Sequence, residues 1–145
     1  MNSVLRFETH SETETIEVGR QLATLLPTHG PVLLIGDLGA GKTTLAKGIA
    51  AGLRAADADQ VSSPTFTLIH EYGEPVRMYH ADLYRLDTQE QASRLGLDEM
   101  LEQRAPVVVE WGERFPALFP PERVEIRIMH SGGDDRLIEV SGLGH

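Results

Sequence analysis

Residues 36–43 read Gly-Asp-Leu-Gly-Ala-Gly-Lys-Thr, and the rest of the chain is understood outward from them. The spacing G-x-x-x-x-G-K-T is the Walker A pattern. Its glycines let consecutive backbone N–H groups turn toward a phosphate, because no Cβ stands in the way. Lys42 would then reach the β- and γ-phosphates, and the hydroxyl of Thr43 would be a ligand of Mg²⁺. The stretch predicts a nucleotide-binding loop.

The segments on either side of this loop support the same prediction. The apolar residues 31–35 predict a buried parallel strand, and a helix is expected from Thr43 to about Arg54. The positive end of the helix dipole would face the anion. The residues expected to bind the nucleotide in this loop are Asp37, Leu38, Gly39, Ala40, Gly41, Lys42, Thr43 and Thr44.

Length and composition restrict the class of protein. The 145 residues fit a single domain over 1–145, and the formal net charge of −9 disfavours a protein that grips nucleic acid by itself. The chain has no cysteine, which excludes disulfides and thiolate chemistry. We find no signal-peptide pattern and no apolar run of membrane-spanning length, so a soluble cytoplasmic protein is expected.

The remaining sequence alternates between strand and helix signals. Ser11 and Glu14 have the spacing of a capping box, which predicts a helix that stops before Pro27. The other predicted elements are an edge strand at 4–7, a hairpin after Pro64 with its second strand at 76–80, mostly helix over 88–103 with an interruption near Gly96, a buried strand at 107–109 and a C-terminal hairpin of 124–128 with 137–140. The fold class predicted is α/β, a P-loop NTPase-like three-layer sandwich with a mixed, mostly parallel sheet and helices on both faces.

Two carboxylates follow predicted strands. Glu110 ends the strand at 107–109, where P-loop enzymes usually place the acid that holds Mg²⁺. Asp82 lies just beyond another strand, where it could orient the attacking water or only cap a turn. His80 is two residues from Asp82, but no third metal ligand follows at a suitable spacing, so we expect it to pack in the core.

Two further residues have a functional and an ordinary interpretation. Thr65 follows the loop helix at the place of a GTPase switch segment and could contact Mg²⁺ or the γ-phosphate, although this segment taken alone favours a plain Ser/Pro turn. Trp111, the only tryptophan, directly follows Glu110 and could form a wall of the nucleotide site or pack in the core.

The absence of two sequence motifs limits which nucleotide the chain could bind and which reaction it could catalyse. Guanine recognition normally uses N/T-K-x-D, which neither Lys42 nor Lys47 forms, so ATP is favoured over GTP. A small-molecule kinase commonly carries an arginine-rich lid, and no arginine cluster is present. The alternatives are a small P-loop kinase acting on a small molecule or protein, and a nucleotide-gated binding module.

The order of these motifs is similar to a known family. The chain closely resembles the bacterial TsaE (YjeE) family in four stretches. These are residues 36–44, Ser63-Pro64-Thr65-Phe66-Thr67-Leu68, His80-Ala81-Asp82-Leu83-Tyr84-Arg85-Leu86 and Val109-Glu110-Trp111. The likeness runs from about Ser11 to Arg127.

This resemblance implies a function and a set of partners. TsaE proteins are small P-loop ATPases needed to make threonylcarbamoyladenosine at position 37 of ANN-decoding tRNAs, and they drive or reset a transferase complex that contains TsaB and TsaD. It further implies a seven-stranded sheet, Mg²⁺ held by Thr43 and Glu110, Asp82 near the γ-phosphate, and a base-contacting segment that includes Ser11 and Thr15. The expected activity is a weak Mg²⁺-dependent ATPase, with tRNA bound mainly by the partners.

Overall fold

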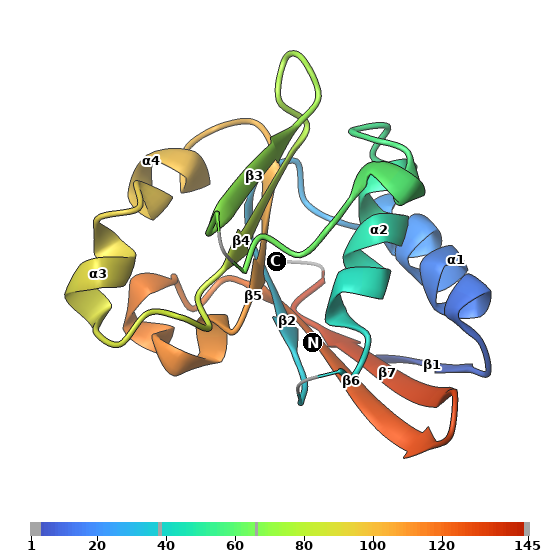
Figure 1. The fold of residues 1–145 in the computed structure, drawn as a ribbon. Coiled ribbons are helices and arrows are strands. Elements are labelled where there is room, and N and C mark those ends of the chain that lie inside the picture. The colour runs from blue at the N-terminus through green and yellow to red at the C-terminus, as the bar shows by residue number, and fades with distance from the viewer. Residues whose placement is uncertain (1–3, 38, 66, 144–145) are drawn as a thin grey trace.

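The protein forms one sheet of seven strands, in the order β1-β7-β6-β2-β5-β4-β3 (Figure 1). The computed structural model describes residues 4–37, 39–65 and 67–143. The strands are β1 (Leu5–Thr9), β2 (Gly30–Ile35), β3 (Ile69–Tyr72), β4 (Met78–Asp82), β5 (Pro106–Glu110), β6 (Val124–Gly132) and β7 (Asp135–Ser141). The mixed seven-stranded sheet expected from the resemblance is confirmed.

Parallel pairing is confined to the centre of this sheet. β2 pairs in parallel with β5 and β6, and β4 pairs in parallel with β5. The outer strands β1, β7 and β3 join by antiparallel pairing. Because parallel strands end at the same edge, the carboxyl ends of β2, β4 and β5 lie next to one another, which is where ligands bind in open α/β sheets.

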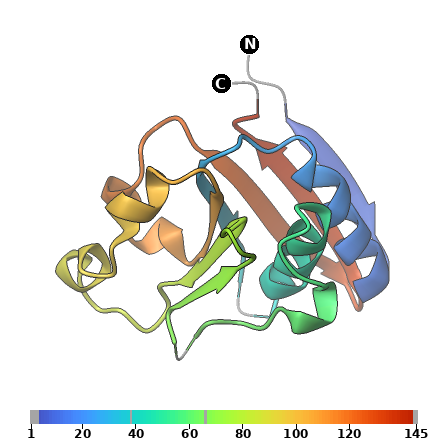
Figure 2. The ribbon, with the colours of Figure 1, turned by 90° about the horizontal axis from the view of Figure 1, so that it is seen from above.

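Helices cover both faces of the sheet, as predicted. Figures 1 and 2 show α1 (Glu12–Ala23) and α2 (Lys42–Gly52) on one face. The other face carries α3 (Gln89–Ser93) and α4 (Leu97–Leu101) with the short turns η2 (Gly112–Arg114) and η3 (Pro116–Leu118). A further turn, η1 (Ala58–Gln60), follows α2. Within the described ranges, no helix is long and apolar enough to cross a membrane.

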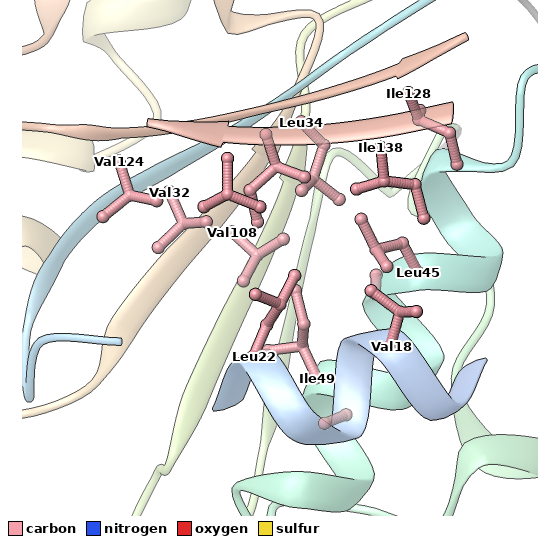
Figure 3. Packing of buried hydrophobic residues seen from close by; sticks show 14 of the residues in the cluster. Val18, Leu22, Val32, Leu34, Leu45, Ile49, Val108, Val124, Ile128 and Ile138 are labelled. Carbon is pink, nitrogen blue, oxygen red and sulfur yellow. The ribbon is translucent and has the colours of Figure 1, made fainter. Parts of the chain in front are cut away.

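The larger core lies between the first two helices and the sheet. Val18 and Leu22 of α1 are four residues apart, as are Leu45 and Ile49 of α2, so each pair shares one face of its helix. Figure 3 shows these side chains pointing toward strand residues such as Val108, and all of them are buried. This packing fixes α2, and with it the loop that precedes it, against the sheet.

The two helices of this layer touch through glycines. A Cβ at Gly19 of α1 would lie 2.5 Å from the carbonyl oxygen of Leu45, and one at Gly48 of α2 would lie 2.0 Å from that of Ile16. Only residues without a side chain allow this approach. α1 and α2 are therefore in direct backbone contact.

The structure tests the predicted element boundaries. α1 ends at Ala23, before Pro27 as predicted, and the hydroxyl of Thr24 just beyond it donates to the Gln21 carbonyl at 2.9 Å. β3 begins only at Ile69, because Leu68 has a φ of +73° that breaks the extended chain. The interruption predicted near Gly96 in the helical stretch at 88–103 is confirmed, because Gly96, with a φ of +83°, separates two short helices. Both predicted hairpins are confirmed.

Candidate nucleotide-binding site

The Walker A loop joins β2 to the start of α2. Gly39 and Gly41 adopt left-handed conformations with φ of +80° and +112°, which glycine allows without strain. Gly41 precedes α2 without a side-chain cap, and the first helical turn contains no acidic residue. Its leading N–H groups are therefore open to an anion, as predicted. Leu38, another predicted contact, lies outside the described residues.

Lys42 is held in a buried position above this loop. Its ammonium donates to the Gly36 carbonyl at 2.7 Å and lies 3.3 Å from the centroid of the Trp111 ring. Trp111 reaches it from a φ of +64°, a conformation that bulky residues rarely adopt. Burial lowers the pKa of Lys42, opposed by the charges of Glu113 and Glu110. Trp111 is thus a wall of the site, and not core packing alone.

Glu110 lies beside the Walker A threonine. Because β5 is parallel to β2, its last residue reaches the start of α2, and Thr43 donates to its two carboxylate oxygens at 3.0 and 3.3 Å. His80 is buried as predicted, and its Nε2 also lies 2.6 Å from Oε2 of Glu110. No sequence pattern predicts this contact between His80 and Glu110.

Asp82 caps a turn, one of the two roles that the sequence left open, and also contacts the 63–65 segment. It is the last residue of β4, not a residue beyond it, and its Oδ1 accepts the Tyr84 N–H at 2.9 Å as a turn cap. Its Oδ2 accepts from Thr65 at 3.0 Å and from Ser63 at 3.2 Å. The 63–65 segment is therefore attached to the carboxylate at the edge of the site.

One cleft brings most of the predicted residues together. The ring of Tyr84, which the sequence analysis did not single out, packs against Trp111 with centroids 5.0 Å apart and planes tilted by 47°, and it closes one side. The residues that line this cleft, here called the phosphate cleft, are Gly39, Gly41, Lys42, Thr43, Thr44, Ser63, Thr65, Asp82, Tyr84, Glu110 and Trp111.

A second cleft, here called the outer cleft, continues from the other side of the loop. It shares Gly39, Gly41 and Thr44 with the phosphate cleft. Its other lining residues are Ser11, Glu12, Thr15, Asp134 and Arg136. Ser11 and Thr15, expected to approach the base, thus lie where the nucleotide would extend beyond the α-phosphate.

Comparison with known proteins agrees with this geometry. The family model described as "Threonylcarbamoyl adenosine biosynthesis protein TsaE" matches residues 9–138. The chain belongs to the TsaE family. A Bacillus subtilis (strain 168) protein named "tRNA threonylcarbamoyladenosine biosynthesis protein TsaE" is 37% identical over 142 residues, which cover 97% of this chain and 87% of the relative.

Other relatives and a solved structure extend this result. A Treponema pallidum protein of the same name is 34% identical over 137 residues, covering 94% of this chain and all of the relative, 100%. The crystal structure of Bacillus subtilis YdiB superposes with a TM-score of 0.78 at 34% identity, over 99% of this chain and 88% of that one. The similarity therefore spans both clefts.

In this TsaE-family chain the donor atoms fit Mg²⁺. Among the residues that the structure describes, no group of three or more His, Asp or Glu side chains could hold a metal ion alone. Thr43 and Glu110 present hard oxygen atoms within hydrogen-bonding distance of each other. Mg²⁺ usually takes one or two protein oxygens and completes its shell with water and substrate phosphates. The site suits an ion that arrives with a nucleotide.

The C-terminal hairpin contributes to this TsaE site through a residue that the sequence analysis missed. Arg136 donates from Nε to the Ala40 carbonyl at 2.7 Å, while its Nη1 donates to the carbonyls of Gly133 and Asp135 at 2.9 Å. It thereby ties the Walker A loop to the hairpin tip. In the sequence, Arg136 is an ordinary polar residue that directly precedes the apolar run 137–140. The local sequence therefore does not predict its contact with Ala40.

Proposed function

We propose that this chain binds ATP with Mg²⁺ and hydrolyses it, as a subunit required to form threonylcarbamoyladenosine at position 37 of ANN-decoding tRNAs. The observation that carries the proposal is the convergence of Lys42, Thr43 and Glu110 at the uncapped start of α2. The names of the relatives in the TsaE family support the tRNA modification.

Each residue of the phosphate cleft has a distinct role in this proposal. Lys42 leaves the Gly36 carbonyl and neutralises charge on the β- and γ-phosphates. Thr43 and Glu110 would hold Mg²⁺, which would supply positive charge to the phosphates. Asp82, with Thr65 attached to it, positions the attacking water near the γ-phosphate. These groups lie within one partly buried cleft, where electrostatic interactions are stronger than in bulk water.

The outer cleft would receive the nucleoside. Thr44 borders both clefts, so it lies at the level of the α-phosphate. Ser11 and Thr15 line the space beyond it, on the path that the ribose and base would take. Gly39 and Gly41 line both clefts, whereas Asp37 and Ala40, also expected to bind the nucleotide, line neither and border a separate cavity beside β6.

The proposal includes partners and a single-domain organisation. TsaB and TsaD, the partners implied by the TsaE resemblance, would contain the transferase that this ATPase drives or resets. The net charge of −9 supports contact with tRNA mainly through those partners. One sheet carries every described strand and borders both clefts, which supports one domain over 1–145.

Nucleoside analysis tests the proposal in cells. Depletion of this protein should remove threonylcarbamoyladenosine from tRNA, and expression of the wild-type chain should restore it while Lys42→Ala should not. In vitro, the emission of Trp111, the only tryptophan, should change when Mg·ATP binds. Unchanged threonylcarbamoyladenosine in depleted cells would overturn the assignment, and unchanged emission with binding shown independently would remove Trp111 from the nucleotide site.

A further inference from the structure

His80 occupies a position in β4 that the proposed mechanism does not yet use. Its side chain has 0% exposure, so burial of an imidazole there needs a compensating contact. His80 and Asp82 lie on the same face of β4, two residues apart. The strand that supplies Asp82 to the phosphate cleft thus places a second polar group beneath it.

That polar group contacts the proposed metal ligand. Nε2 of His80 lies 2.6 Å from Oε2 of Glu110, while Nδ1 is buried and has no hydrogen-bond partner among the described residues. A proton on Nε2 therefore satisfies the one buried N–H of a neutral ring, whereas a second proton would leave a buried donor unpaired. We take His80 as the donor and Glu110 as the acceptor.

Glu110 needs such a contact because of its length. P-loop enzymes usually place Asp at this strand end, and Glu has one additional rotatable bond. Oε2 of Glu110 accepts from both His80 and Thr43, so the carboxylate is fixed from β4 and from the start of α2. An ionised carboxylate has about four acceptor sites, so both contacts leave capacity for a cation or its water.

We propose that His80 is a positioning residue that holds the Glu110 carboxylate in the orientation that binds the metal–nucleotide complex. The inference rests on the proposed function, because it concerns the same metal. Hydrogen-bond partners of metal ligands typically contribute about 10- to 100-fold to metal affinity. His80 acts in this way without touching the nucleotide.

Mn²⁺ with ADP provides a direct measure that does not depend on turnover. Mn²⁺ is titrated into the protein in the presence of saturating ADP, and the free Mn²⁺ is quantified by electron paramagnetic resonance. His80→Leu, which removes the donor, should weaken Mn²⁺ binding about 10- to 100-fold. His80→Gln, whose amide can donate from a similar place, should recover most of the affinity. His80→Asn is polar but too short to reach Glu110, so it should behave like His80→Leu and replaces it if the leucine variant does not fold.

His70→Gln is the matched control. His70 is the cross-strand neighbour of His80 in β3, but its ring contacts Thr67 and Tyr72, so the same substitution should leave Mn²⁺ affinity unchanged. In a Glu110→Gln background, His80→Leu should cause little further loss, because both changes remove one interaction.

The outcomes separate this inference from the proposed function. If the wild-type protein with ADP binds no Mn²⁺, both are wrong. If the wild type binds Mn²⁺ and the folded His80→Leu or His80→Asn variant binds it equally well, only the role of His80 is wrong. Losses that add fully in the double variant with Glu110→Gln would also overturn it, because His80 would then act independently of Glu110.

Discussion

The helices α1 and α2 lie side by side on one face of the sheet, but their N-termini differ. Ser11 caps α1 by accepting the Glu14 N–H at 3.1 Å, and Glu12 and Glu14 add negative charge to its first turn. α2 follows Gly41 with no side-chain cap and no acid. Every helix start leaves unpaired N–H groups and a partial positive charge. At α1 the Ser11 side chain pairs one of these N–H groups, whereas at α2 no side-chain cap pairs any of them, which leaves them available to a ligand.

The largest expected effect is on the rate of ATP hydrolysis, because the phosphate cleft at the uncapped start of α2 lacks an arginine among its described residues. None of the described residues that line the phosphate cleft is an arginine, and Arg114 donates to the Leu83 and Tyr84 carbonyls. In P-loop enzymes an added arginine contributes about 10³- to 10⁵-fold in rate. We therefore expect the TsaB–TsaD complex to accelerate ATP hydrolysis by about 10³-fold or more.

Phosphate release, measured with and without that complex, checks this prediction. The partner surface would also hold Thr65 and Asp82 against the γ-phosphate. Equal rates for the isolated and the assembled protein would show that the site is complete in this chain alone.

Lys42→Ala should produce the next largest effect, because it removes the side-chain charge at the start of α2. Removal of a contact to charge that develops in the transition state often lowers the reaction rate about 10²-fold or more. ATPase activity of the assembled complex measures the loss. Lys47→Ala is the control, since Lys47 is the only other lysine, lies on the same helix and does not line either cleft. A Lys42→Ala enzyme as active as the control would contradict the proposed role.

Arg136→Gln should weaken nucleotide binding about tenfold, because a hydrogen bond from a charged donor contributes about 1.5–3 kcal/mol. The Ala40 carbonyl would lose its partner, and the loop before α2 would be less well fixed. Titration of Trp111 emission with Mg·ADP gives the affinity. Arg6→Gln removes an exposed ion pair with Glu139 in the outer strands and should not alter it. Equal affinities for both variants would show that the loop holds its shape without the hairpin.

Ser11→Ala removes the side-chain cap from the N-terminus of α1. Loss of an N-cap hydroxyl typically lowers the free energy of unfolding by about 1 kcal/mol. Urea unfolding measures this, with Ser131→Ala, an exposed serine in β6, as the control. Unchanged stability in the Ser11 variant would show that the two glutamates suffice to stabilise this helix start.

The smallest expected effect depends on pH. Asp135 hydrogen-bonds His10, just before α1, at 2.8 Å and raises the pKa of His10 above its ordinary 6.5. The stabilisation is fully present below the ordinary pKa and is lost as pH rises through the raised value. His10→Ala should therefore reduce stability slightly at about pH 5.5 and not at about pH 9. Because the pair is exposed, added salt should reduce the difference. A pH-independent effect would exclude this ion pair as the cause.

The phosphate end of the site could be predicted from sequence because its residues follow strong local patterns. Lys42 and Thr43 belong to a fixed motif, and Glu110 and Asp82 end strands whose apolar composition is recognisable. Parallel pairing brings those strand ends together, so sequence order was sufficient to infer proximity.

The supporting contacts could not be predicted in the same way. His80 and Glu110 are 30 residues apart, and Arg136 and Ala40 are 96 apart. Each contact depends on the register of neighbouring strands and on side-chain direction, and neither leaves a pattern in one segment.

The glycine contact between α1 and α2 also affects a cleft that neither glycine lines. A Cβ at Gly48 would lie 2.0 Å from the Ile16 carbonyl oxygen and one at Gly19 would lie 2.5 Å from that of Leu45, so a larger residue at either position would force the helices apart. Ser11, Glu12 and Thr15 at the start of α1 and Thr44 of α2 line the outer cleft. The width of the outer cleft therefore depends on two small residues buried behind it.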